Sequence, residues 1–191
     1  MKKVLVAAFA LVSLTASVQE GTLLVAGDVN LGTSKTPSAP NDIKSTNLSL
    51  NPTVGYQFNE NWTAGVKAEI GSSKYTSNTN VVSKSSSIGV GPFVRYTKTL
   101  SNIFSLYGQL EGMFGTNKSN GTKTSTSTNV NLFPAVYVNV KNGFGLSFSF
   151  GGLGYSSNKP TGGKATNSFG INFGQTANIG IQKNFSLGKK K

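Results

Sequence analysis

The chain has 191 residues and a formal net charge of +12, because 18 lysines and arginines stand against 6 aspartates and glutamates. A length of this order accommodates a single domain. The sequence contains no cysteine and no histidine, which excludes disulfides, Cys/His zinc sites, cysteine nucleophiles and histidine-dependent triads. Beyond the N-terminus, no apolar stretch reaches the roughly 18 residues that a membrane-spanning helix needs. We expect neither a cofactor nor a bound metal.

The N-terminal residues have the pattern of a secretory signal peptide. Lys2 and Lys3 precede an apolar run from Val4 to Leu14, and small residues around Ala16 and Ser17 follow it. A basic start, a short apolar centre and a small-residue exit are the three parts of such a signal. The sequence therefore predicts a signal peptide over 1–17, a single domain over 18–187 and a basic periplasmic tail over 188–191.

Apolar and polar residues alternate with a period of two in eight later segments. These segments cover residues 23–31, 48–58, 62–70, 88–96, 104–114, 130–140, 144–150 and 169–185. A period of two is typical of a strand with two different faces, and most segments approach the ~10 residues with which a tilted strand crosses a bilayer. Three connections, 59–61, 98–103 and 141–143, are short.

The other four connections, 33–46, 73–86, 116–128 and 156–167, are long and rich in Ser, Thr, Asn and Lys, a composition typical of solvated loops. Alternating short and long connections predict an all-β fold, a transmembrane eight-stranded up-and-down antiparallel barrel. The long loops would be extracellular, and both termini would be periplasmic.

The composition of the two faces favours lipid outside and a filled lumen inside. A soluble lipid-carrying barrel also alternates, but its water-washed surface has no reason to consist of small Gly, Ser, Thr and Asn residues. Such residues fit the narrow lumen of eight strands. Aromatic residues also cluster on the apolar face near the short turns and the final strand end, as expected at a membrane interface. They are Tyr56, Phe58, Trp62, Tyr96, Phe104, Phe144 and Phe185.

Two stretches and one aromatic residue carry a resemblance to a known family. The segment 132–155, LFPAVYVNVKNGFGLSFSFGGLGY, resembles the penultimate hairpin of the small outer-membrane β-barrel family common in Bacteroidetes. The segment 52–66, PTVGYQFNENWTAGV, resembles that family's second hairpin, and Phe185 is similar to the terminal aromatic read by the barrel assembly machinery. The resemblance implies an outer-membrane barrel of the porin-like superfamily, with no shared catalytic signature.

Five charged residues fall on the lumen face: Asp28, Lys67, Glu69, Arg95 and Glu111. They could gate a pore or form an acid/base site, but a mutually neutralising network is favoured because unpaired buried charge is costly. Hydrolysis of glycosides by two carboxylates requires an open cleft between them, and acyl transfer of the serine type requires a histidine. We therefore expect no enzymatic activity.

Each long connection carries two lysines, and together the four contain a single acid, Asp42. The eight lysines are Lys35, Lys44, Lys74, Lys84, Lys118, Lys123, Lys159 and Lys164. Such charges can simply confer solubility, but so one-sided a balance favours attraction to phosphorylated lipid. The sequence predicts a structural or interaction barrel in the outer membrane of a Gram-negative bacterium, whose loops meet lipopolysaccharide or another polyanion. No nucleic-acid partner is expected, and the alternative function is a small-solute pore.

Overall fold

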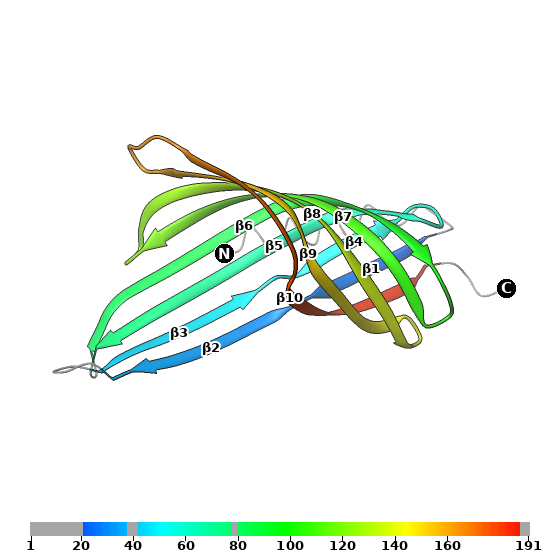
Figure 1. Ribbon diagram of the computed structural model, residues 1–191, viewed down its shortest axis with the longest axis horizontal. Helices are drawn as coiled ribbons and strands as arrows, with labels where there is room; N and C mark the ends of the chain where they lie inside the picture. Colours follow the sequence, from blue (N-terminus) through cyan, green and yellow to red (C-terminus); the bar gives the residue numbers. More distant parts are fainter. Residues whose placement is uncertain (1–20, 38–41, 78–79, 188–191) are drawn as a thin grey trace.

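The computed structural model describes residues 21–37, 42–77 and 80–187, and the predicted signal peptide and basic tail lie outside these residues. Ten strands in the described part of the chain form one antiparallel sheet (Figure 1). In chain order they are β1 (Thr22–Gly27), β2 (Val29–Thr36), β3 (Ile43–Leu50), β4 (Thr53–Gln57), β5 (Trp62–Ser77), β6 (Asn80–Thr99), β7 (Phe104–Ser119), β8 (Thr122–Lys141), β9 (Phe144–Pro160) and β10 (Thr166–Ser186).

These ten strands make an eight-membered hydrogen-bonded ring. β1 and β2 are one strand interrupted at Asp28, and β3 and β4 are one strand interrupted at Asn51 and Pro52. The two interruptions lie side by side, because the Asn51 backbone N–H and side-chain amide both donate to Asp28, at 3.0 and 2.7 Å. When β1–β2 and β3–β4 are each counted as one strand, every strand pairs with its neighbour in sequence, and β1 pairs with β10 to close the ring. The predicted eight-stranded up-and-down barrel is confirmed.

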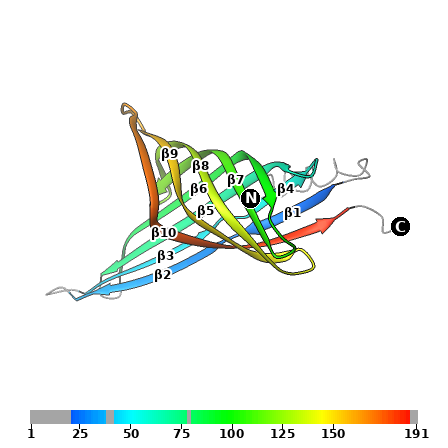
Figure 2. The same ribbon diagram turned by 45° about the vertical axis from the view of Figure 1, so that its right-hand side comes forward.

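The closure of the ring covers only one part of the barrel's length. The ladder between β1 and β10 runs from Thr22↔Ser186 to Gly27↔Ile181 and ends there. In the residues that the structure describes, β2 pairs with β3 alone and the first part of β10 pairs with β9 alone. β9 and β10 rise away from β2 and β3 beyond this point (Figure 2). We call the gap between β2 and residues 166–180 of β10 the seam.

The four long connections were wrongly predicted to be loops. β2 and β3 extend to Thr36 and from Ile43, and β7 and β8 meet at a turn of two residues, Asn120 and Gly121. Both of these turn residues have positive φ, 48° and 85°, which is the conformation that an Asn-Gly hairpin turn requires. Alternation disappears in these segments because both faces of a hairpin beyond the barrel wall meet water, but the strand pairing continues.

The barrel has an inverted distribution of polarity. Its large aliphatic and aromatic side chains mostly lie exposed on the outer surface, including Leu110, Phe114 and Ile181. Its buried residues face the lumen, and they mix apolar side chains such as Phe93 and Tyr107 with polar ones such as Gln109 and Gln182. No buried side-chain nitrogen or oxygen in the described residues lacks a hydrogen-bond partner. The closed end of the lumen is therefore occupied by side chains, with a small apolar cluster around Tyr107, Ala135 and Tyr137, and its buried polar groups are hydrogen-bonded.

Candidate functional site

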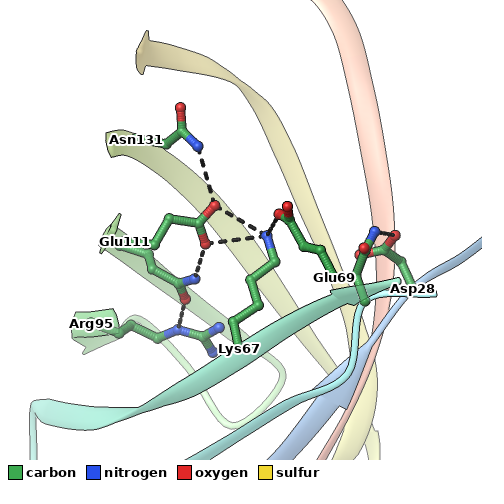
Figure 3. A network of polar contacts seen from close by, with 8 residues as sticks. Asp28, Lys67, Glu69, Arg95, Glu111 and Asn131 are labelled. Carbon is green, nitrogen blue, oxygen red and sulfur yellow. Dashed lines mark hydrogen bonds and ion pairs between the residues drawn. The ribbon is translucent and has the colours of Figure 1, made fainter. Parts of the chain in front are cut away.

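The structure brings three of the five predicted lumen charges into contact (Figure 3). Lys67 Nζ lies 3.1 and 3.3 Å from the two carboxylate oxygens of Glu111 and 3.4 Å from Glu69 Oε1. Glu111 is only 4% exposed, and it also accepts hydrogen bonds from Gln109 at 3.0 Å and from Asn131 at 3.4 Å. Four donor contacts thus stabilise one buried carboxylate. We call Lys67, Glu69 and Glu111 the lumen cluster.

Arg95 is joined to the lumen cluster through an amide. It is 6% exposed, and its Nε donates to Gln109 Oε1 while Nη1 donates to Gln182 Oε1, both at 2.8 Å. Its guanidinium carbon lies 4.0 Å from the centre of the Tyr107 ring. No carboxylate in the described part of the chain forms an ion pair with Arg95. Asp28 is also outside the cluster, since it accepts its hydrogen bond from Asn51.

The predicted interface aromatics gather at the end of the barrel that carries the short turns. Trp62 and Tyr96 are cross-strand partners whose ring centres are 5.1 Å apart, in an edge-to-face arrangement. Tyr56 and Phe185 are the partners of Leu23 on its two sides. Phe104 and Phe144 begin β7 and β9, and Phe58 follows β4. Strand register therefore places all seven aromatics at this one end.

The lysines of the long hairpins are directly opposed in pairs. Lys35 is the cross-strand partner of Lys44, Lys74 of Lys84, and Lys118 of Lys123. Residues opposite each other in an antiparallel ladder point to the same side, and like charges in this arrangement repel. Lys164 alone of the eight lies outside a strand, in the connection between β9 and β10.

Neighbouring pairs join into a continuous row on the outer face. Lys44 is diagonal to Lys74, because Thr46 is the partner of Lys74. Lys84 is diagonal to Lys118, since Ser86 is the partner of Lys118 and the Asn120 N–H donates to the Lys84 carbonyl at 2.7 Å. Diagonal neighbours are about 7 to 8 Å apart. Lys159 on β9 stands apart from this row, because its partner is Thr126, three residues from Lys123. We call the row together with Lys159 the lysine belt. It consists of Lys35, Lys44, Lys74, Lys84, Lys118, Lys123 and Lys159.

The belt has a fixed height above the apolar surface. On six strands an outward apolar residue has a Ser or Thr two residues away and a Lys four residues away, both in the direction of the long hairpins. The six sets are Leu31–Thr33–Lys35, Leu48–Thr46–Lys44, Ile70–Ser72–Lys74, Ile88–Ser86–Lys84, Phe114–Thr116–Lys118 and Tyr155–Ser157–Lys159. Four residues of strand rise about 13 Å, or about 9 Å along the barrel axis at a tilt near 45°.

Comparisons with known proteins find structural likeness only. No model of a protein family and no curated protein matches the chain. Among solved structures it is similar to Neisserial surface protein A, with 13% identity, coverage of 87% of this chain and 97% of that chain, and a TM-score of 0.42. It is also similar to the attachment invasion locus protein Ail of Yersinia pestis, with 15% identity, coverage of 88% and 100%, and a TM-score of 0.40.

A third likeness is to the translocator domain of the autotransporter NalP from Neisseria meningitidis, at 17% identity and a TM-score of 0.40. The alignment covers 91% of this chain but only 63% of that domain, so the chain spans under two thirds of its length. At this distance the likenesses assign neither a family nor a function. Membership of the Bacteroidetes-type family stays a prediction.

The lysine belt follows a sequence pattern that the analysis of apolar alternation does not detect. The spacing of apolar residue, hydroxyl residue and lysine at i, i±2 and i±4, with the sign set by the direction of the strand, is present in the sequence, and it continues the period of the strands. It escapes notice when the polar segments are treated as loops, because a loop has no faces. Only Lys35 of the belt forms an ion pair within the described residues, at 2.6 Å from Asp42.

Proposed function

We propose that the chain is an integral barrel of the outer membrane whose lysine belt binds the phosphate groups of lipopolysaccharide or of another polyanion. The exposed apolar outer surface supports the membrane location, because water-exposed barrels do not present such a surface. The interface aromatics would then lie at the periplasmic boundary and the belt at the extracellular one. The proposal assigns the chain no catalytic activity.

The opposed lysine pairs are the observation that carries the ligand class. Each pair places two ammonium groups on one side of a hairpin. In the Lys74–Lys84 and Lys118–Lys123 pairs, for which the described residues supply no carboxylate partner, the repulsive cost is less than about 1 kcal/mol in water. A phosphate dianion between them turns this repulsion into attraction. Each lysine near an anionic surface contributes about 1 kcal/mol. The seven lysines lie at one height on β2, β3, β5, β6, β7, β8 and β9. They form a band of positive charge on the outer surface rather than a deep pocket.

Side chains inside the closed end of the lumen argue against the alternative function, a small-solute pore, because they leave little space for a channel. Arg95, Phe93, Tyr107 and Tyr137 are buried inside the closed end, and an eight-stranded barrel has little free bore. We expect purified protein to give no steady conductance across planar bilayers. A stable open current would favour the pore over the binding function.

Titration of folded protein with lipopolysaccharide at several salt concentrations tests the proposal. We expect binding to weaken steeply with salt, because exposed charges are screened within about 8 Å at physiological ionic strength. The variant K74Q/K84Q should bind more weakly than the parent. The matched control K98Q/K141Q removes two exposed lysines at the opposite end of the barrel and should bind like the parent.

Dephosphorylated lipopolysaccharide separates phosphate binding from adsorption of the acyl chains. We expect it to bind all three proteins equally and weakly. If K74Q/K84Q binds phosphorylated lipopolysaccharide as well as the parent does, or if salt has no effect, the belt serves solubility and the proposed function is wrong.

A further inference from the structure

The seam exposes two strand edges in the part of the wall that carries apolar residues. Leu31 and Val29 on β2 are 74% and 67% exposed, and Phe169 and Ile171 on β10 are 68% and 65% exposed. These are the four largest exposed fractions among the large apolar residues of the described chain. β10 diverges there because its register with β9 shifts between Phe173 and Asn178, next to Gly174, which has a φ of 78°.

A cavity of about 760 Å³ lies directly behind the seam. Its lining includes Val29 and Asn30 from β2, Gly170, Ile171, Asn172 and Asn178 from β10, and the lumen cluster side chains Lys67 and Glu111. The unpaired edges therefore border a polar interior. Unpaired backbone groups at membrane depth are tolerated where they line a water-filled cavity, so water in this cavity can satisfy them.

The chemistry of the cavity differs sharply from that of the surface outside the seam. Four charged residues line the cavity, two cations and two carboxylates: Asp28, Lys67, Arg95 and Glu111. Their formal charges sum to zero, so the net charge of the lining favours neither an anionic nor a cationic guest. The rest of its polar lining consists of amides and hydroxyls, among them Asn131, Asn172 and Ser149. Such groups suit an uncharged or zwitterionic polar guest.

We propose that the seam and this cavity bind a single-chain amphiphile. Its uncharged or zwitterionic headgroup lies in the cavity against the asparagines, and its acyl chain leaves through the seam between Val29 and Ile179, which both line the cavity, into the lipid. Polar and apolar environments meet only at an opening in the wall, and an amphiphile is the class of molecule that matches both sides. The site depends on the barrel's membrane location but not on phosphate binding by the lysine belt.

The absence of native cysteine allows the seam to be locked by design. The outward pairs of the β1–β10 ladder are Leu23↔Phe185, Val25↔Lys183 and Gly27↔Ile181. Continuing this ladder by one step would place Val29 opposite Ile179. Oxidation of V29C/I179C therefore closes the cavity-side end of the seam. Oxidation of V25C/K183C bridges strands that are already paired, and it serves as the matched control.

The binding probe is a lysophosphatidylcholine with a photoactivatable diazirine in its acyl chain, added to folded protein in lipid nanodiscs. We expect saturable labelling of β2 and β10 that unlabelled lysophosphatidylcholine competes away. Oxidised V29C/I179C should lose this labelling and regain it on reduction, whereas oxidised V25C/K183C should be labelled like the parent. K74Q/K84Q should also be labelled like the parent, so a failure of the belt proposal is distinguishable from a failure of this one.

Labelling that is unsaturable and even around the barrel overturns the inference, as does undiminished labelling of the locked protein. Intermolecular cross-links between V29C and I179C of two copies also overturn it, because a strand of a second copy would then occupy the seam. If V29C/I179C does not oxidise within one chain, N172W gives the same test by filling the cavity mouth. Folded N172W, identified by its heat-sensitive migration on gels, should lose the saturable labelling, and retained labelling contradicts the proposal.

Discussion

Substitution of Lys67 by methionine tests the electrostatics of the lumen. The change keeps an unbranched side chain as far as Cε but removes the ammonium group, which lies 3.1 Å from Glu111. Glu111 then remains buried with only the amides of Gln109 and Asn131 as partners. Loss of one partner from a buried ion pair typically costs about 3 to 5 kcal/mol. The cavity beside Lys67 supplies some water, so we expect a loss of about 3 kcal/mol, at the lower end of that range.

Neutralising both partners should recover most of this loss. In K67M/E111Q no uncompensated charge is left from the pair, and a neutral pair of similar shape often costs little. E111Q alone should cost less than K67M, because Lys67 keeps its contact with Glu69. Urea unfolding of the parent, the two single variants and the double variant in lipid vesicles gives the coupling energy. A loss below about 1 kcal/mol for K67M, or additivity of the two changes, would mean that water from the adjacent cavity screens this ion pair almost completely and that the reasoning is wrong.

Three further predictions concern other parts of the barrel. R95A should destabilise the barrel by about 2 to 4 kcal/mol, since it leaves two buried amide oxygens without their donor, and R95K should recover only part of this in the same unfolding assay. G121V should destabilise the β7–β8 hairpin by about 1 to 3 kcal/mol, because valine disfavours positive φ, and hydrogen exchange should increase there first. Protease added to intact cells should cleave the lysine-bearing hairpins but leave residues 59–61 uncut.

The sequence predicts the wall of the barrel well because one face of each strand must be apolar. Period-two alternation is strongest in segments such as 62–70, where Ala64 to Ile70 all obey it, and these segments become strands. The same reasoning fails above the apolar region, where both faces are polar and no alternation remains. The turn signal Asn120-Gly121 was available, and it indicates that strands continue on both sides.

The partners within the site depend on register, which the sequence alone does not provide. Lys67 and Glu111 are 44 residues apart in the chain, and only the pairing of three successive strands brings them together. Arg95 shows the limit most clearly, because its partners are the uncharged residues Gln109 and Gln182 rather than the carboxylates that charge balance suggested. The sequence also does not predict the seam, because β2 and β10 show the same alternation of apolar and polar residues as strands that are paired on both sides.

A cysteine scan along β5 tests most directly whether the apolar face of this barrel lies in lipid and the belt at its surface. Spin labels at single cysteines in folded protein report collisions with oxygen, which concentrates in lipid, and with a water-soluble nickel complex. We predict that labels replacing Ala68 and Ile70 collide with oxygen, whereas a label replacing Glu69 does not. A label replacing Lys74 should collide with the nickel complex. If labels replacing Ala68 and Ile70 instead collide with the nickel complex, these residues face water. That result would contradict an apolar outer surface in lipid and the functions proposed for the barrel.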